Sequence, residues 1–296
     1  MGVRRSQTTA ASFLLVPFVA IACSAGVTAT PPAAAPTAVA ASPSAMPAES
    51  GMSPGMSEMP MSSELAALHW TVAVSGLTSG STVTSNAVAL DVTPSGYTFS
   101  CAHAGKPNLP TTGHYHVELD HALVNMYCTP AATISMQNVD PGKHTLTVLP
   151  ATNSHDELTS AAVAIDFTYQ PTKPLPPITA LANPGNPSIT IVSPAAGSTV
   201  SGDFAVKVQI SGFTVSGDLF GKASLAGYGH WHLNVDSTTQ GMMGMATMLG
   251  MASSDTFQAS TVGLSPGKHT FFALLVDNQH SPLNPPVVAQ VELIVQ

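Results

Sequence analysis

Hydrophobic and polar residues alternate in short runs along most of this 296-residue chain, and Gly, Pro, Ser and Asn separate the runs. A period of two is typical of strands that bury one face, and the runs show no helical period. We therefore predict six strands in each of two successive regions. They are His69–Ser75, Ala87–Val92, His114–Asp120, Thr133–Val139, His144–Leu149 and Val163–Tyr169, then Ser188–Val192, Phe204–Ile210, His230–Asp236, Thr256–Val262, His269–Val276 and Val287–Val295.

Short strands at this spacing favour an all-β fold with two tandem immunoglobulin-like antiparallel β-sandwich domains. We expect domain 1 at residues 66–170 and domain 2 at residues 187–296, joined by a proline-rich linker at 171–186. Both domains carry Gly-Ser-Thr-Val after the first strand, at 80–83 and 197–200, which indicates an internal repeat.

Two further motifs recur in register. Gly-His-Tyr-His-Val-Glu-Leu-Asp at 113–120 returns as Gly-His-Trp-His-Leu-Asn-Val-Asp at 229–236, and Pro-Gly-Lys-His-Thr follows each copy at 141–145 and 266–270. Within each first motif the aromatic and aliphatic residues point to one face of the strand and the histidines to the other. We expect the aromatic face to enter the core and the histidine face to point outward from the sheet.

The histidines at alternate positions predict a metal site in each domain. Two such side chains lie ~6–7 Å apart on the same face. In this fold the third strand pairs antiparallel with the strand that follows the Pro-Gly-Lys turn, which runs here from His144 to about Leu149 and again from His269. The loop after that strand therefore lies near the paired histidines. The predicted ligands are His114, His116 and His155 in domain 1, and His230, His232 and His280 in domain 2. The alternative is that these side chains are solvated surface histidines.

Imidazole ligands suit copper, zinc or nickel, and the methionines favour copper. Thioethers select Cu(I), and methionines gather in the tether before domain 1 and in residues 241–251. Methionine also fills gaps in cores, but these clusters stand among Gly and Ser. We expect copper, with zinc as the alternative, and a capture segment containing Met242, Met243, Met245 and Met248.

Other recurring polar residues have a structural interpretation. His144 and His269 follow Pro-Gly-Lys, where sandwiches of this type place a corner residue that hydrogen-bonds back to the turn. Four more residues could orient the imidazoles or form turns, and we favour turns: Asp120, Asp236, Asn153 and Asn278.

The start of the chain predicts export. Arg4 and Arg5 precede an apolar run, and Ala20-Ile21-Ala22-Cys23 resembles a bacterial lipoprotein signal. We expect a signal peptide at 1–22, lipid attachment at Cys23 and a disordered tether of Ala, Pro, Ser and Met at 23–65. This places the protein on the cell membrane, facing the periplasm or the exterior, with the lipid as its only membrane contact. Plain secretion with cleavage near Ala22 is the alternative.

The net charge and the cysteines limit the classes of partner and of metal ligand that the chain can use. Removal of residues 1–22 takes away both arginines and no acidic residue, which changes the net charge from −8 to −10. Nucleic-acid binding requires a basic footprint, so we exclude it. Cys101 and Cys128 favour one disulfide in an exported chain, with thiolate ligation of a metal as the alternative.

The histidine motifs, Pro-Gly-Lys-His-Thr and Asn-x-His together resemble a bacterial domain-of-unknown-function family of exported proteins. The resemblance covers 187–296 well and 66–170 more loosely, and it implies the domain layout and the histidine positions. Gly263–Gly267 fits G-x-S-x-G by letter but falls in a turn, so we expect a metal-binding protein rather than an enzyme. The alternatives are a structural or adhesive envelope module without metal, and a copper oxidoreductase. No protein partner is assigned.

Overall fold

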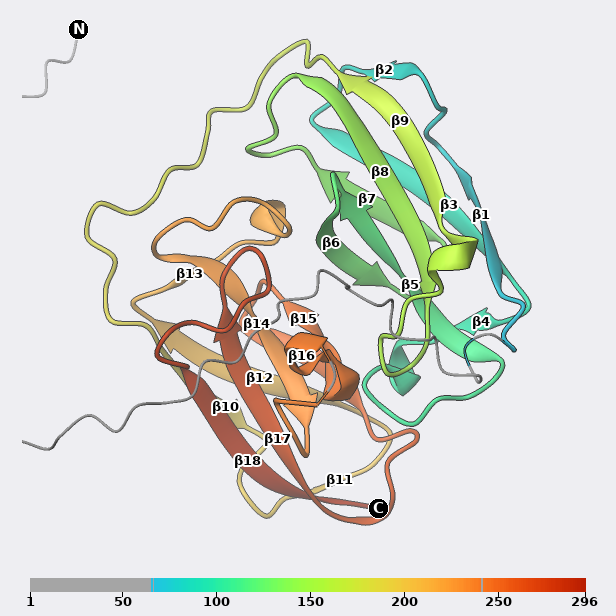
Figure 1. Cartoon of the computed structure of the whole chain (residues 1–296). Coiled ribbons are helices and arrows are strands. Elements are labelled where there is room, and N and C mark those ends of the chain that lie inside the picture. The colour runs from blue at the N-terminus through green and yellow to red at the C-terminus, as the bar shows by residue number, and fades with distance from the viewer. Residues whose placement is uncertain (1–64, 66, 241) are drawn as a thin grey trace, which may run out of the picture. The chain divides into compact units, whose positions relative to one another are not determined.

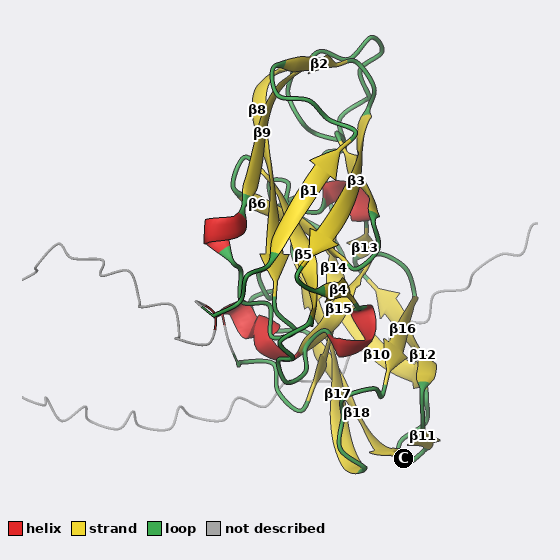
Figure 2. Ribbon diagram, turned by 90° about the vertical axis from the view of Figure 1, so that its right-hand side faces the viewer, coloured by secondary structure: helices red, strands yellow, loops and turns green. Residues whose placement is uncertain are grey.

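The computed structural model of the chain describes residues 65, 67–240 and 242–296, and within them two β-sandwiches follow one another (Figure 1). Strands dominate, and the helices are short 3-10 turns (Figure 2). The predicted signal peptide, Cys23 and nearly all of the predicted tether lie outside the described residues. No helix among the described residues is long and apolar enough to cross a membrane.

Domain 1 packs a three-stranded sheet, β1-β3-β7, against a larger sheet with the order β2-β9-β8-β5-β4, in which β6 also pairs with β5. Most of its strand pairs are antiparallel. Its elements are β1 (Thr71–Ser75), β2 (Ser81–Val83), β3 (Ala87–Ser95), β4 (Thr98–Phe99), η1 (Cys101–His103), β5 (Thr112–Leu119), β6 (Ala122–Tyr127), β7 (Ala131–Ser135), β8 (Gly142–Ala151), η2 (Thr159–Ala161) and β9 (Val163–Tyr169).

Domain 2 repeats this arrangement, with the sheets β10-β12-β16 and β11-β18-β17-β14-β13, and with β15 paired to β14. Its elements are β10 (Ser188–Ser193), β11 (Thr199–Val200), β12 (Asp203–Ser211), β13 (Thr214–Val215), η3 (Gly217–Leu219), β14 (Tyr228–Val235), η4 (Met242–Thr247), β15 (Met248–Ala252), β16 (Thr256–Ser260), β17 (Gly267–Val276) and β18 (Val288–Val295).

The all-β prediction and the sandwich fold are confirmed, and every predicted strand overlaps an observed one. The predicted strand at Thr133–Val139 was placed too late. Strand β7 ends at Ser135, because a turn follows in which Asn138 has a φ of 55°. The prediction also missed β6 and β15, which extend the larger sheets beside β5 and β14.

Each sandwich has its own core, built from the inward faces of its strands. Tyr115, Val117 and Leu119 of β5 are buried in the core of domain 1, and Trp231 and Leu233 of β14 in that of domain 2. The predicted assignment of the aromatic face to the core is therefore confirmed. Cys101 and Cys128 form a disulfide with their Cα atoms 5.3 Å apart, so neither offers a thiolate to a metal.

The described residues all belong to one compact unit, so the two sandwiches are docked together. Strand β15 contacts β6 and η1, and η3 contacts β7. Two equivalent glycines approach the opposite domain closely. A Cβ on Gly105 would lie 2.5 Å from the Met248 carbonyl oxygen, and one on Gly221 would lie 2.6 Å from that of Leu123. The interface therefore uses corresponding surfaces of the two domains, as a two-fold dimer does.

Candidate metal centre

The six predicted histidines come together as two buried triads. Strand β5 presents His114 and His116, and the loop after β8 presents His155; these three form triad 1. His114 Nε2 lies 3.0 Å from His116 Nε2 and 3.0 Å from His155 Nδ1, and the last two nitrogens lie 3.3 Å apart. The pairing of β5 with β8, which sets His114 opposite Ala151, brings the loop to this position.

Hydrogen bonds fix two of the three ring orientations in triad 1. His155 Nε2 donates to the Met248 carbonyl at 2.7 Å, and His116 Nδ1 donates to Glu157 Oε1 at 2.6 Å. A neutral imidazole carries one N–H, so the other nitrogen of each ring holds a lone pair directed into the triad. A proton on His114 Nε2 can be shared between these lone pairs, whereas a cation at the centre satisfies all three nitrogens.

Triad 2, formed by His230, His232 and His280, repeats the geometry in domain 2. His230 Nε2 lies 3.0 Å from His232 Nε2 and 2.9 Å from His280 Nδ1. His280 Nε2 donates to the Leu123 carbonyl of domain 1 at 2.7 Å. Each loop histidine thus donates to a carbonyl of the opposite domain. These are the same two carbonyls that Gly105 and Gly221 approach closely.

The triads are buried on the outer faces of their sheets. The histidines point outward from their sheets, as predicted. Docking of the two domains covers both faces, so the rings are not solvated as the alternative required. No triad histidine is more than 5% exposed. Leu274, also on the outer face, is buried with them.

Burial favours the neutral form of His114, His155, His230, His232 and His280. Burial, reinforced by His155 and His116, holds the pKa of His114 well below its usual range, and burial lowers the pKa of His155 to about 3. In domain 2, burial is also the main cause that lowers the pKa of His230, His232 and His280. Neutral imidazole is the form that ligates metals, so these rings need not lose a proton to do so.

The loop histidines occupy a strained backbone region in both domains. His155 and His280 each have a φ of 65°, which costs a residue with a side chain about 1 kcal/mol or more. The carbonyls of Asn153 and Asn278 accept from Gly105 N and Gly221 N, and their side-chain amides also hold the neighbouring loops. The asparagines therefore position the loops, as the turn interpretation predicted, and do not contact the imidazoles by any described hydrogen bond.

The nitrogen separations match those around a small transition-metal ion. An ion bonded to three imidazole nitrogens at ~2.0–2.1 Å in tetrahedral geometry sets them about 3.3 Å apart. The separations given above for the two triads lie within a few tenths of an ångström of that value. Each triad can therefore hold one ion and leave a position for a further ligand.

The structure describes part of the predicted methionine capture segment. This part folds into η4 and β15, and Met245 and Met248 are buried. Met248 acts through its backbone carbonyl, which accepts from His155. Strand β15 pairs with β14 and so extends the larger sheet of domain 2. The side chains of Met242 and Met243 lie outside the described part.

The corner histidines are structural, as predicted. His144 Nδ1 donates to Asp120 Oδ2 at 2.7 Å and its Nε2 lies 2.9 Å from the Asp140 carbonyl. His269 and Asp236 repeat the first contact at 2.7 Å in domain 2. The two aspartates therefore serve the corners and do not touch the triads by any described contact.

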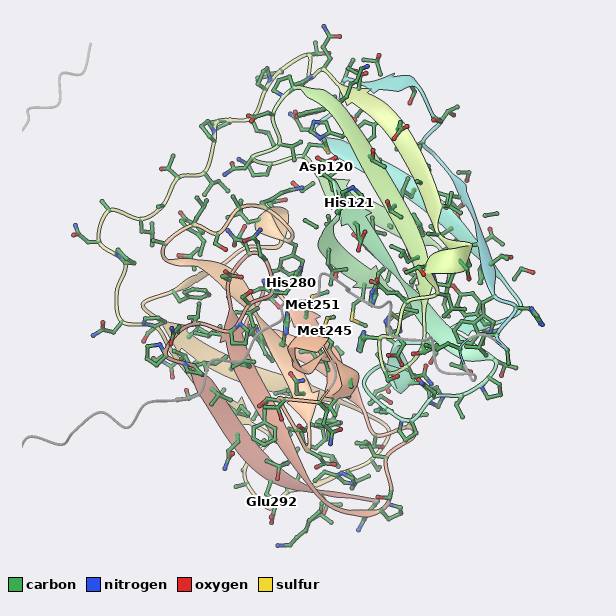
Figure 3. The ribbon with its side chains drawn as sticks, viewed as in Figure 1. Asp120, His121, Met245, Met251, His280 and Glu292 are labelled. Atoms are coloured by element: carbon green, nitrogen blue, oxygen red, sulfur yellow. A yellow bond between two sulfur atoms is a disulfide. The ribbon has the colours of Figure 1, made fainter. Side chains whose placement is uncertain are left out.

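Two of the cavities lined by described residues of both domains contain methionine side chains. One, of about 300 Å³, is lined by His280 and Met245 of domain 2 and by Glu118, His121 and Glu157 of domain 1. Figure 3 labels His280, Met245 and His121 among them. The cavity reaches His280 of triad 2 and the carboxylate that accepts from His116 of triad 1.

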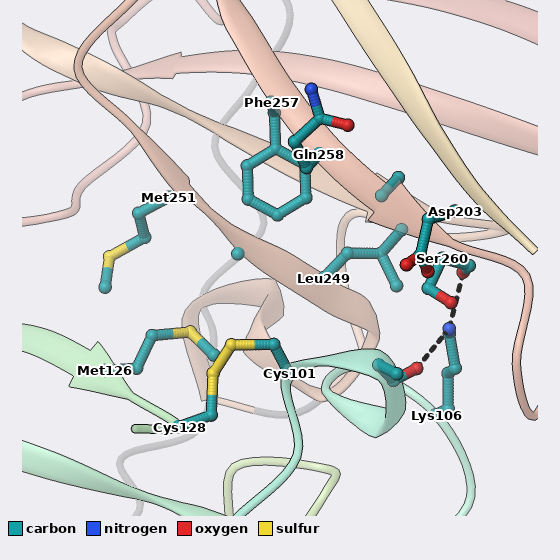
Figure 4. Close-up of a pocket in the computed structure, with 13 residues that line it drawn as sticks. Cys101, Lys106, Met126, Cys128, Asp203, Leu249, Met251, Phe257, Gln258 and Ser260 are labelled. Atoms are coloured by element: carbon teal, nitrogen blue, oxygen red, sulfur yellow. Dashed lines mark hydrogen bonds between the residues drawn. A yellow bond between two sulfur atoms is a disulfide. The ribbon is translucent and has the colours of Figure 1, made fainter. Parts of the chain in front are cut away.

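The other cavity, of about 510 Å³, has Met126 and Met251 in its lining, beside the disulfide (Figure 4). Lys106 closes one end of it. Its Nζ donates to the carbonyls of Ser260 and Val262 in domain 2, both at 2.6 Å, which adds a polar connection between the domains.

Sequence reasoning missed the groups that orient the triads. Glu157 stands two residues after His155, a spacing that could have suggested it. The carbonyls of Leu123 and Met248 belong to β6 and β15, which are among the strands that the pattern did not predict. The identity of a side chain does not reveal whether the backbone carbonyl of its residue accepts a hydrogen bond.

No family model and no curated protein matches the chain. Among solved structures, the fibronectin(III)-like modules of Clostridium thermocellum CbhA are 10% identical, with 76% of this chain and 94% of that chain covered and a TM-score of 0.24. The endo-beta-1,4-mannanase from Thermotoga petrophila is 12% identical, with 39% and 21% covered and a TM-score of 0.24. A Dscam structure is 9% identical, with 76% and 46% covered and a TM-score of 0.21. This chain thus spans less than half of the last two chains, and likeness at this level concerns the fold alone.

Proposed function

We propose that this chain is an exported protein that binds one transition-metal ion in each domain, for storage, delivery or resistance at the cell surface. Copper is the ion that we favour, and zinc is the alternative. A signal peptide at 1–22 and a lipid on Cys23 would bring the protein to the membrane, with residues 23–65 as its tether.

The convergence of three imidazole nitrogens in each triad is the observation that carries this proposal. The rings are buried, and hydrogen bonds to Glu157, Met248 and Leu123 direct the free nitrogens of His116 and His155 into triad 1 and that of His280 into triad 2. Solvated surface histidines would need neither burial nor such orientation. Imidazoles suit copper and zinc equally, and the thioethers of Met245 and Met251 in the neighbouring cavities favour copper.

Metal analysis of the signal-free chain, purified without chelator and titrated with copper and zinc, tests the proposal. We expect two ions per chain, and one ion after His114→Ala or after His230→Ala. His144→Ala is the matched control, because it removes a histidine that serves only a corner, and two ions should remain. A native chain that takes up neither ion above background would refute the proposal and leave the structural or adhesive module as the function.

A further inference from the structure

The two triads share their geometry but differ in the residues around them. The repeated motifs show which residues correspond. Two residues after the second strand histidine, Glu118 of domain 1 corresponds to Asn234 of domain 2, and two residues after the loop histidine, Glu157 corresponds to Pro282. Directly before the glycine at the interface, Ala104 corresponds to Phe220. Triad 1 is therefore accompanied by carboxylates that triad 2 lacks.

The carboxylate of Glu157 is tied directly to triad 1. Its Oε1 accepts from His116 Nδ1 at 2.6 Å, and that ring is only 1% exposed, so negative charge is held against a buried ligand. Glu118 is half-buried on β5, the strand that also carries His116, and it lines the same cavity as Glu157. His280 also borders this cavity, but its Nε2 is directed to the Leu123 carbonyl instead of a carboxylate.

Triad 2 has uncharged residues at the compared positions. Asp277 acts on His280 through its charge, but its carboxylate accepts from Ser224 and from backbone amides instead of from a triad histidine. Asn234 donates its amide to the Gly244 carbonyl at 2.7 Å and so holds η4. The ring of Phe220 lies over His230, with the ring centres 4.2 Å apart, and it also packs into the core of domain 1. No acidic side chain hydrogen-bonds a triad 2 histidine among the described contacts.

This difference in charge sets which ion each triad can bury. Transfer of a cation from water to a protein interior is costly, and the cost rises steeply with its charge. Three neutral imidazoles do not offset the charge, whereas a carboxylate hydrogen-bonded to a ligand neutralises part of it and makes the ligand more basic. A singly charged, soft ion is the one that an uncharged triad beside an aromatic ring accommodates best.

We propose that triad 1 selects a divalent ion, Cu(II) or Zn(II), and that triad 2 selects Cu(I). The inference rests on the proposed function and adds to it that the two sites are unequal. The protein would thus hold copper in both oxidation states, or zinc and Cu(I) together, in one chain.

Two single-site variants of the signal-free chain test this: His230→Ala keeps triad 1, and His114→Ala keeps triad 2. Zn(II) affinity is measured by chelator competition, and Cu(I) affinity against a chromogenic Cu(I) chelator under reducing, oxygen-free conditions. We expect triad 1 to bind Zn(II) about tenfold or more tightly than triad 2, and the order to reverse for Cu(I). If either variant fails to fold by circular dichroism, His280→Ala or His155→Ala replaces it.

Substitution of Glu157 separates charge from shape. Glu157→Gln keeps an oxygen acceptor for His116 and removes the charge, so the Zn(II) affinity of triad 1 should fall about tenfold while its Cu(I) affinity changes little. Glu292→Gln is the matched control, since that exposed carboxylate pairs with Lys268 on the surface. Equal preferences in the two single-site variants, or equal losses for both ions in Glu157→Gln, would overturn the inference. Absence of metal from both single-site variants would instead refute the proposed function.

Discussion

The close approach of Gly105 to the opposite domain gives the sharpest test of how the triads are held. Gly105 has a φ of +70°, and a Cβ there would lie 2.5 Å from both the carbonyl carbon and the oxygen of Met248. That oxygen accepts from His155 Nε2. Gly105→Ala must therefore push β15 away from domain 1 or strain both backbones, and in either case it disturbs the acceptor of a triad 1 ligand.

The size of the effect can be worked from two contributions. An alanine at positive φ costs about 1 kcal/mol, and overpacking against a backbone that cannot move freely costs about 1–3 kcal/mol more. Gly197→Ala is the matched control, because Gly197 has a φ of +76° and a Cβ there would meet nothing within 4 Å. The control should lose about 1 kcal/mol of unfolding free energy, and Gly105→Ala about 2–4 kcal/mol.

Urea unfolding of the metal-free chain, followed by tryptophan fluorescence, measures this difference. Trp70 is buried in domain 1 and Trp231 in domain 2, so both domains report. The metal affinity of triad 1, measured in the His230→Ala background, should fall about tenfold with Gly105→Ala and stay unchanged with the control, because His155 loses its acceptor. Equal losses of stability and affinity in Gly105→Ala and Gly197→Ala would show that the carbonyl of Met248 does not hold triad 1.

Three further predictions follow from single groups. His144→Ala should destabilise the chain by about 1–3 kcal/mol in thermal unfolding, because the Asp120 contact is lost. A metal stoichiometry below two ions per chain in this variant would contradict its corner role. Cys101→Ser with Cys128→Ser should cost about 3.5 kcal/mol, from the entropy of a loop closed over a separation of 27 residues, and a denaturant midpoint unchanged by the double substitution would refute this. Lys222 Nζ is buried without a hydrogen-bond partner among the described residues, and burial lowers the pKa of Lys222 to about 8. The unfolded chain keeps this proton up to about pH 10.5, so the free energy of unfolding should rise between about pH 8 and 10.5, and Lys222→Met should remove that rise whereas exposed Lys207→Met should not.

The convergence of the histidines was predictable because it follows from strand register alone. Alternation put His114 and His116 on one face, and the antiparallel pairing of their strand with the strand that begins at His144 put His155 beside them. The corner role of His144 followed from its place after Pro-Gly-Lys. These are local or topological properties, which a sequence pattern records directly.

The burial of the triads was not predictable in the same way, since it depends on docking of two domains that each look complete. Strands β6 and β15, which form the docked surface, lack clean alternation because a register shift interrupts their pairing with β5 and β14. Met248 was singled out for its sulfur, but its described contact with the triad is made by its carbonyl. Side-chain identity carries no information about that choice.

The exchanged acceptors at the interface bear on how such a chain can be divided or redesigned. The repeats suggest two interchangeable domains. In each domain, however, the loop histidine donates to a backbone carbonyl oxygen of the other domain, and that hydrogen bond orients its ring. If the chain were truncated to one domain, or if one domain were replaced by a different one, the loop histidine of the remaining domain would lose its carbonyl acceptor while its backbone stayed strained. The smallest piece of this molecule that keeps the acceptors of both loop histidines is therefore the pair of domains, and a change to one triad has to take the opposite domain into account.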